Sequence, residues 1–303
     1  MTQGWRSIME SLLQCCRGIP PADRMDWQEV MRAAQWHGVF PYVYRQVEAH
    51  RGPGGMPLAW REAYGRQVSR QLQLESRLRE LLGSFAGLSS RIIPIKGPVL
   101  AHQAYDRPLL RQFSADLDFY APEFSPSLWD QVLGLLGYQR IPGSSRDQDR
   151  FAHQYVSGEG RVVLDIHTSL LPDREDGEYR WIMERCRPGV FDGVPCWELP
   201  LPFQLFLLDL NVRYSNGHTH LRYYLDGASL CQRMSGEEWG QVAAHLGGYD
   251  QGTSLYLSLY LAGEIFGARV PEEITRALAT PFRQQLARNY LRLLPFQYGI
   301  FLR

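Results

Sequence analysis

Apolar residues in the first quarter of the chain recur at the spacing of amphipathic helices. They return every three or four positions, as at Trp27, Val30 and Ala34, and this period predicts helices rather than strands. Asp26 stands directly before Trp27, where a helix cap is expected. A longer polar helix is predicted over residues 58–82, with leucines on or near one side. Nothing in this quarter demands chemistry, so we interpret it as a helical layer that packs against a sheet.

The pattern changes in the middle of the chain, where short apolar runs bounded by turn residues predict strands. Four strands are predicted, over residues 91–95, 115–121, 151–156 and 161–169. Two short helices are predicted between them, over residues 98–105 and 129–136. A Ser-Gly-Glu-Gly turn separates the last two strands and is typical of a hairpin. The middle region therefore combines a small sheet with short helices.

Helical spacing returns after a proline-rich stretch at residues 188–202, which we interpret as a linker with room for one short strand. Five helices are predicted beyond it, over residues 203–212, 220–234, 236–246, 253–266 and 271–294. The whole pattern predicts an α+β fold in which a small mixed β-sheet core is flanked by N-terminal helices and a C-terminal helical bundle. The predicted domain ranges are 1–88, 89–199 and 200–303.

Charge and composition narrow the classes of partner. The 303 residues include 32 Lys and Arg and 32 Asp and Glu, so acidic and basic side chains balance. Phosphate contacts supply much of the affinity of nucleic-acid binders, so this balance argues against a long nucleic acid as partner. The five cysteines form no CxxC pair, and no signal peptide or membrane-length apolar run is visible. We therefore expect a cytoplasmic protein with reduced cysteines that does not contact a membrane.

Two aspartates on the second predicted strand are the first candidates for chemistry. Strand side chains alternate between faces, so Asp116 and Asp118 project from the same side. Adjacent carboxylates repel each other, and a divalent cation can neutralise them. Surface strands also carry alternating acids without any ligand, so this pair alone leaves both interpretations open.

The last predicted strand adds a third carboxylate. Asp165 interrupts an apolar run, and His167 lies on the same face two residues later. A buried carboxylate needs a cation or several hydrogen-bond donors. If this strand lies beside the first aspartate strand, three carboxylates converge, which suits two magnesium ions in phosphoryl or nucleotidyl transfer. His167 is open to three roles: a hydrogen bond to Asp165, a phosphate contact, or a structural one.

A Lys-Gly turn before the first aspartate strand supplies positive charge. Gly97 permits close backbone approach, and the helix that follows offers free N–H groups and its positive dipole end to an anion. Lys96 would then bind a phosphate oxygen as a point charge, although a plain strand-to-helix turn is an equal alternative. Arg111 and Ser114, just before the aspartates, either bind phosphate or pair with the acids.

Three segments together resemble a known enzyme superfamily. They are IKGPVLAHQAY from Ile95, RQFSADLDFY from Arg111 and VLDIHTSL from Val163. These runs resemble the nucleotidyltransferase superfamily of the DNA polymerase beta type. Within it they are most similar to a bacterial group described as uncharacterised nucleotidyltransferases. The likeness is close in the middle region and looser in the flanking helices, where Arg222 and Asp226 match a recurrent pattern.

The resemblance implies roles for individual residues. It implies that Asp116, Asp118 and Asp165 bind magnesium, most simply as two ions, and that Asp165 activates the acceptor hydroxyl. The donor would be a nucleoside triphosphate such as ATP, and the acceptor a small-molecule, sugar or peptide hydroxyl. Better-known members carry Gly-Ser at the helix start, whereas this chain has Lys96 and Gly97 there.

Other interpretations remain open from the sequence. The same fold can serve as a nucleotide-binding or partner-binding protein without catalysis, or as a phosphotransferase that moves the terminal phosphate. His218 and His220 have a spacing that a metal site can use, although a histidine-rich loop is more often solvent-exposed. Arg222 and Asp226 are four residues apart on a predicted helix, where they either pair with each other or line a substrate pocket.

Overall fold

The structure of the chain is a computed structural model. It describes residues 2–19, 26–88, 91–114, 116–123, 125–142, 152–168, 181, 183–214, 220–247, 249 and 252–295. Helices predominate among these residues, and the strands form one five-stranded mixed sheet and one hairpin. The predicted α+β class is therefore confirmed. The elements fall into two compact units.

The first compact unit is helical. It comprises Met1–Val68, Ala104–Gln112 and Gln204–Arg303. Its N-terminal elements are α1 (Thr2–Cys16), α2 (Trp27–Trp36), α3 (Phe40–Arg51), η1 (Pro53–Gly55) and the first part of α4 (Leu58–Phe85). Its later elements are η2 (Pro108–Leu110), most of α9 (Leu201–Tyr214), α10 (Leu221–Arg233), α11 (Gly236–Leu246), α12 (Gly252–Phe266), α13 (Glu272–Leu278) and α14 (Pro281–Leu293). The three-part division at residues 88 and 199 stays a prediction.

Polar side chains cap the N-termini of several of these helices. The Asp26 carboxylate accepts a hydrogen bond from the Glu29 backbone N–H, which confirms the predicted cap of α2. At the start of α11, Ser235 and Glu238 form a reciprocal capping box. Such caps satisfy N–H groups that the first helical turn leaves without partners.

The last predicted helix, over residues 271–294, is two helices in the structure. α13 ends at Leu278 and α14 begins at Pro281. Thr280 caps α14, because its side chain accepts a hydrogen bond from the Arg283 backbone N–H. Proline has no N–H to donate and drives the preceding residue into extended backbone, where Thr280 lies. The prediction of one continuous helix is therefore wrong.

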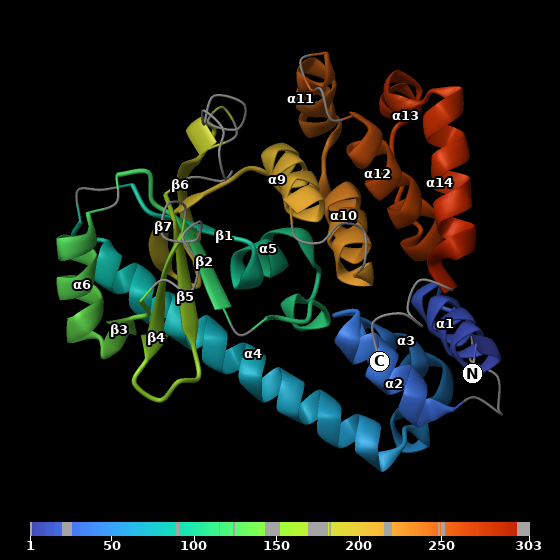
Figure 1. The fold of residues 1–303 in the computed structure, drawn as a ribbon, viewed down its shortest axis with the longest axis horizontal. Coiled ribbons are helices and arrows are strands. Elements are labelled where there is room, and N and C mark those ends of the chain that lie inside the picture. Colours follow the sequence, from blue (N-terminus) through green and yellow to red (C-terminus); the bar gives the residue numbers. More distant parts are fainter. Residues whose placement is uncertain are drawn as a thin grey trace. The chain divides into compact units, whose positions relative to one another are not determined.

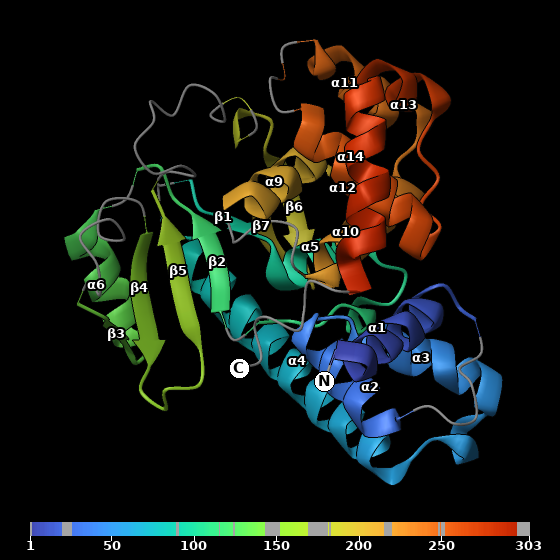
Figure 2. The same ribbon diagram turned by 45° about the vertical axis from the view of Figure 1, so that its right-hand side comes forward.

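The second compact unit carries the five-stranded sheet. It comprises Ser69–Gln103 and Phe113–Phe203. Its strands lie in the order β1 (Ile93–Ile95), β2 (Asp116–Tyr120), β5 (Val163–His167), β4 (Ala152–Ser157) and β3 (Tyr138–Arg140), as Figure 2 shows. The helices α5 (Gly97–Ala104) and α6 (Pro126–Leu135) follow β1 and β2 in the chain. β2 and β5 are parallel and the other neighbours antiparallel, so the sheet is mixed and the predicted β4–β5 hairpin is confirmed.

One face of this sheet forms the core of the unit. Phe119 of β2 and Ile166 of β5 are fully buried among side chains from the second half of α4 and from α6, which lie beside the strands in Figure 1. Phe85 of α4 contributes to this core. Because strand side chains alternate, Asp118 and Asp165 project from the opposite face. The core thus fixes which face of the sheet is left for polar chemistry.

The structure contains strands that the sequence pattern did not predict. β3 follows α6 and pairs with β4. β6 (Arg187–Phe191) and β7 (Val194–Glu198) form a separate hairpin where a linker with at most one strand was predicted. Asp192 and Gly193 connect them with positive φ angles of 46° and 81°, as a tight two-residue hairpin turn requires. The Asp-Gly pair was thus the readable signal, and the segment holds two strands where room for one short strand was predicted.

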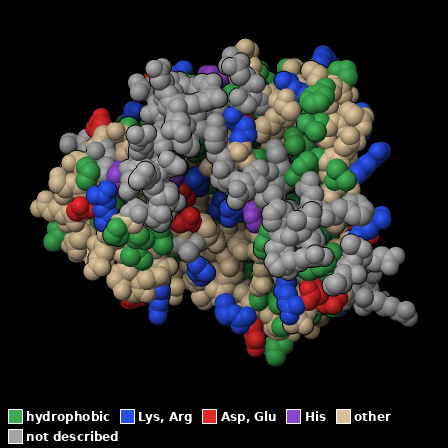
Figure 3. Space-filling view, viewed as in Figure 1, with side chains coloured by type: hydrophobic (Ala, Val, Ile, Leu, Met, Phe, Trp, Pro, Cys, Tyr) green, Lys and Arg blue, Asp and Glu red, His purple; other side chains and the backbone are tan. Residues whose placement is uncertain are grey.

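The described surface mixes charges of both signs. In Figure 3, Lys and Arg side chains are scattered over the face shown together with Asp and Glu. This mixture agrees with the equal numbers of acidic and basic residues in the sequence. In the part of the chain that the structure describes, no helix has the length and apolar character needed to cross a membrane.

Candidate functional site

The pairing of two parallel strands sets the geometry of the acidic site. β2 and β5 are neighbours, and their register places Asp118 directly beside Asp165. Residues that are paired across adjacent strands project from the same face of a sheet. Leu117 and Leu164 are paired one position earlier and are buried in the core on the other face. The alternation of apolar and acidic residues along both strands therefore brings two carboxylates together.

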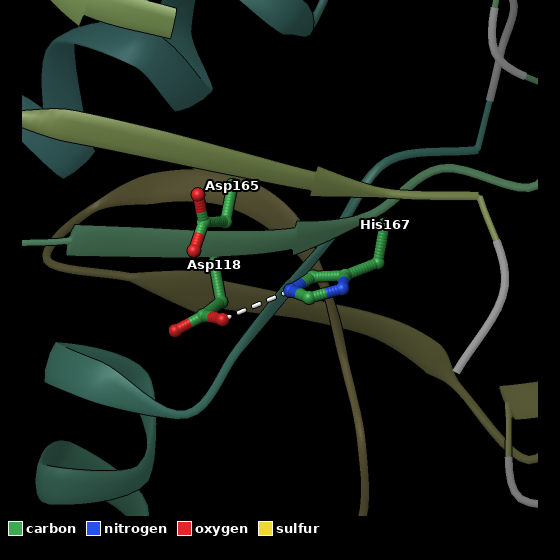
Figure 4. A group of neighbouring side chains, drawn as sticks. All are labelled: Asp118, Asp165 and His167. Atoms are coloured by element: carbon green, nitrogen blue, oxygen red, sulfur yellow. Dashed lines mark hydrogen bonds and ion pairs between the residues drawn. The ribbon is translucent and has the colours of Figure 1, made fainter. Parts of the chain in front are cut away.

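His167 completes a three-residue cluster with these carboxylates. One ligand atom from each of Asp118, Asp165 and His167 lies within 4.8 Å of the other two. The Nε2 atom of His167 is 3.0 Å from Oδ1 of Asp118. Figure 4 marks this contact with a dashed line. Asp118 is buried, whereas Asp165 and His167 are half-buried. The cluster is therefore anchored in the sheet at Asp118 and open toward solvent at its other two members.

Lys96 reaches the cluster from the turn that follows β1. β1 pairs with β2 so that Ile95 lies opposite Asp118, and Lys96 is the next residue. The Lys96 Nζ atom donates a hydrogen bond of 2.8 Å to Oδ1 of Asp118. Lys96 and Gly97 have φ angles of 57° and 39°, so two successive left-handed residues turn the chain from β1 into α5. The predicted Lys-Gly turn is present and directs its lysine at the aspartates.

The left-handed backbone at Gly97 leads to a stability prediction. A methyl group at this position would meet no atom within 4 Å, so only the backbone conformation opposes a side chain there. We expect Gly97→Ala to lower the free energy of unfolding by about 1 kcal/mol in urea denaturation, since a side chain disfavours positive φ. Gly83→Ala is the matched control: it lies in α4, has equal space, and is expected to raise stability slightly. A neutral Gly97→Ala variant would contradict the argument.

Burial and neighbouring charges set the protonation of the site. Burial alone would raise the pKa of Asp118, but the Lys96 ammonium and the His167 hydrogen bond outweigh it and hold that pKa far below its ordinary value. Burial likewise opposes the charged form of Lys96, but the carboxylates, Asp118 above all, raise its pKa. Burial and the charge of Asp118 raise the pKa of Asp165. The site therefore combines an ionised Asp118 with an Asp165 that is more basic than an ordinary aspartate.

Gln154 is a site residue that the sequence reasoning missed. β4 pairs with β5 so that Gln154 lies beside Asp165, and its Nε2 donates a hydrogen bond of 2.9 Å to Oδ1 of Asp165. No described residue donates a hydrogen bond to the other oxygen, Oδ2. The hairpin was predicted, but the register that places Gln154 beside Asp165 was not. The amide thus fixes the orientation of the carboxylate and leaves one oxygen for a ligand.

Asp116 lies on the same face of β2 as Asp118 but outside the three-residue cluster. Its register partner on β5 is Val163, two positions before Asp165. The Oδ1 atom of Asp116 is buried and has no hydrogen-bond partner among the described residues. The negative charge of Asp116 nevertheless helps to raise the pKa values of both Lys96 and Asp165. Asp116 therefore adds negative charge to the site, while its Oδ1 atom has no hydrogen-bond donor among the described residues.

Arg111 lies in the helical unit, bound to an aspartate of α10. Its Nε and Nη2 atoms donate hydrogen bonds of 2.8 Å and 3.0 Å to the two carboxylate oxygens of Asp226. The Tyr105 hydroxyl donates a third, of 2.6 Å, to Oδ1. All three side chains are buried. Of the two interpretations left open for Arg222 and Asp226, mutual pairing does not hold, because Asp226 pairs with Arg111 while the Arg222 guanidinium lies over the Tyr223 ring.

Two further groups from the sequence analysis do not join the acidic cluster. Ser114 is half-buried just before β2. The Nδ1 atom of His220 lies 3.0 Å from the Trp36 carbonyl oxygen, and burial lowers the His220 pKa. His218 lies outside the described residues. The structure thus gives His220 a packing contact within the helical unit.

Comparison with known proteins places the chain in a family. A family model described as uncharacterised nucleotidyltransferase matches residues 23–267, which is most of the chain. The chain belongs to this nucleotidyltransferase family. The family assignment confirms the resemblance inferred from the three sequence segments. No curated protein and no solved structure matched the chain.

Nucleotidyltransferases use divalent metal ions, and the residues of the acidic site fit such a group. Carboxylate oxygens are the ligands that magnesium prefers, and Asp118 and Asp165 offer them from adjacent positions. Asp116 adds a buried oxygen that the described protein leaves without a donor. The Lys96 ammonium already binds one of these carboxylates, so the site accepts positive charge. The donor set therefore suits a hard divalent cation.

Proposed function

We propose that this nucleotidyltransferase moves a nucleoside monophosphate from a magnesium-bound nucleoside triphosphate to a hydroxyl of a small-molecule, sugar or peptide acceptor. The observation that carries the proposal is the direct pairing of Asp118 with Asp165 on parallel strands. Neighbouring carboxylates at partly buried positions are costly unless positive charge compensates them. Lys96 supplies part of that charge, and a metal-bound triphosphate supplies the rest together with the reacting group.

The site residues bind metal, bind the triphosphate or transfer a proton in the proposed reaction, and Asp165 has two of these roles. Asp116, Asp118 and Asp165 would hold two magnesium ions, while Lys96 and the Gly97 turn would bind the triphosphate oxygens. When bound, magnesium neutralises the triphosphate and stabilises the charge that develops on the leaving pyrophosphate. His167 positions Asp118 through its hydrogen bond. Arg111 and Ser114, for which phosphate binding was one of two interpretations, are not included in this mechanism.

The proposed proton transfer involves Asp165. Gln154 holds Oδ1, so Oδ2 faces the acceptor and takes the proton of its hydroxyl. The acceptor oxygen then forms a bond to the α-phosphorus, and the bond from this phosphorus to pyrophosphate breaks. The raised pKa of Asp165 makes it a better base than an ordinary aspartate at neutral pH.

The products distinguish nucleotidyl transfer from the alternatives. Each of the four triphosphates, labelled at the α- or the γ-phosphate, is incubated with the protein, magnesium and pools of sugars, peptides and metabolites. Nucleotidyl transfer places the α-label on a new compound and releases γ-label as pyrophosphate. A phosphotransferase instead moves the γ-label and releases nucleoside diphosphate. A protein that binds the nucleotide without catalysis changes neither label.

Asp165→Asn tests the assignment of the base. We expect turnover to fall about a hundredfold to ten-thousandfold, because an amide cannot accept the hydroxyl proton. The triphosphate should still bind within about tenfold of wild type, since the asparagine oxygen keeps one metal ligand. The labelled-product assay measures turnover, and calorimetry measures binding.

Asp192→Asn provides the matched control for this variant. Asp192 is an exposed aspartate of the same unit that pairs with Arg79, and asparagine tolerates its left-handed backbone. The control should retain wild-type turnover and binding. Full activity in Asp165→Asn, with the control also active, would remove Asp165 from the mechanism.

A further inference from the structure

The Lys96 side chain occupies the carboxylate that the proposed metal needs. Its ammonium lies 2.8 Å from Oδ1 of Asp118, and Nε2 of His167 lies 3.0 Å from the same oxygen. The Asp118 side chain is 8% exposed and the Lys96 side chain 27%. The carboxylate is thus fixed in the sheet, whereas part of the lysine remains accessible to solvent.

An ion pair and metal coordination compete at this oxygen. A carboxylate oxygen that coordinates a small divalent cation cannot keep an ammonium at hydrogen-bond distance without bringing two positive charges together. Asp116 and Asp165 also attract the Lys96 ammonium, so its interaction extends over all three acidic side chains. A free divalent ion that binds Oδ1 of Asp118 must therefore displace Lys96 against the attraction of all three carboxylates.

The Lys96 ammonium can move from Asp118 to a phosphate without a change in the backbone. The lysine side chain is a flexible four-carbon chain, so rotation about its bonds can move the ammonium while the backbone stays in place. The residue is held at a φ angle of 57°, which is uncommon for a side chain other than glycine and occurs where surrounding structure enforces it. The next residue, Gly97, opens α5, whose first N–H groups favour an anion within reach of the same lysine.

We propose that Lys96 is an exchangeable counter-ion that couples metal binding to triphosphate binding. Resting on the proposed function, this inference adds an order of events: Lys96 pairs with Asp118 until a magnesium–triphosphate complex arrives. The ammonium then transfers to a phosphate oxygen, and Asp118 is released to the metal. The site therefore takes metal and triphosphate together, and it binds free metal weakly.

Binding of Mn²⁺ alone tests the exchange without any turnover. Free Mn²⁺ is titrated by electron paramagnetic resonance into the wild type, Lys96→Met and Lys96→Arg. We expect Lys96→Met to bind Mn²⁺ roughly tenfold tighter than the wild type, because the competing charge is gone. Lys96→Arg keeps the charge and should stay near the wild type. Arg79→Met removes a positive charge from an exposed pair in the same unit and should change nothing.

The same substitution should have the opposite effect on the affinity for ATP in the presence of Mn²⁺. Lys96→Met should bind Mn²⁺–ATP roughly tenfold more weakly than the wild type, so one substitution strengthens metal binding and weakens nucleotide binding. Equal or weaker Mn²⁺ binding by folded Lys96→Met overturns the exchange, and so does unchanged ATP binding. If the wild type binds no Mn²⁺ complex of ATP, GTP, CTP or UTP, the proposed function itself fails, which is a different result from a failed exchange.

Discussion

Replacing Asp118 with asparagine is expected to abolish nucleotidyl transfer, with a loss of about a thousandfold or more, because one carboxylate organises the whole site. Lys96 and His167 both bind its Oδ1 atom, and Asp165 lies beside it in the strand register. An amide keeps the shape but not the charge that holds a divalent cation. The labelled-triphosphate assay measures the loss, and Asp192→Asn serves as the charge-matched control. Wild-type turnover in Asp118→Asn would contradict this role.

The same variant has a signature in the pH dependence of stability. The pKa of Asp118 lies below its value in an unfolded chain, so its ion pair stabilises the fold at neutral pH. This contribution is lost as the pH falls below about 4, where the unfolded chain takes up the proton. At pH 7, Asp118→Asn should lower the free energy of unfolding by about 1–3 kcal/mol, less than for a fully buried pair because Lys96 is partly exposed. The difference between variant and wild type should shrink at acid pH.

Replacing Asp226 with alanine is expected to destabilise the helical unit by about 3–5 kcal/mol, because it leaves a buried guanidinium without its carboxylate. Asp226 is 1% exposed and accepts two hydrogen bonds from Arg111 and one from Tyr105. The fork geometry makes this the strongest class of charge-assisted hydrogen bond. Urea denaturation measures the change in the free energy of unfolding.

Two comparisons show whether burial is the cause of that effect. Glu272→Ala breaks an exposed pair with Arg276 in the same unit and should cost no more than about 0.5 kcal/mol. The double variant Arg111→Met/Asp226→Leu removes both buried charges and should recover much of the loss. A loss below about 1 kcal/mol in Asp226→Ala would contradict the burial argument.

The acidic face could be predicted from the sequence because strand periodicity decides it locally. Apolar residues before and after Asp118 and Asp165 bury one face of each strand, and the aspartates must then project from the other. The structure meets the condition set for these two strands, because β2 and β5 are neighbours. Lys96 was found because it stands directly after a short apolar strand and before a glycine.

The remaining contacts depend on register and long-range pairing, which local patterns do not fix. Gln154 reaches Asp165 only through the pairing of β4 with β5, and Asp116 lies outside the cluster because its partner is Val163. Arg111 stands five residues before Asp116 in the chain, yet its carboxylate partner, Asp226, lies on α10. Sequence proximity suggested a phosphate or acid partner near β2, and only the fold identified the partner.

Calorimetric titration of triphosphates tests the central claim most directly. ATP, GTP, CTP and UTP are each titrated into the wild type and Asp118→Asn, with and without magnesium, after thermal unfolding has shown both proteins to be folded. The claim predicts that at least one triphosphate binds the wild type only with magnesium, and that Asp118→Asn loses this binding. Magnesium-dependent binding that survives in Asp118→Asn, or no binding of any triphosphate by the folded wild type, would contradict it.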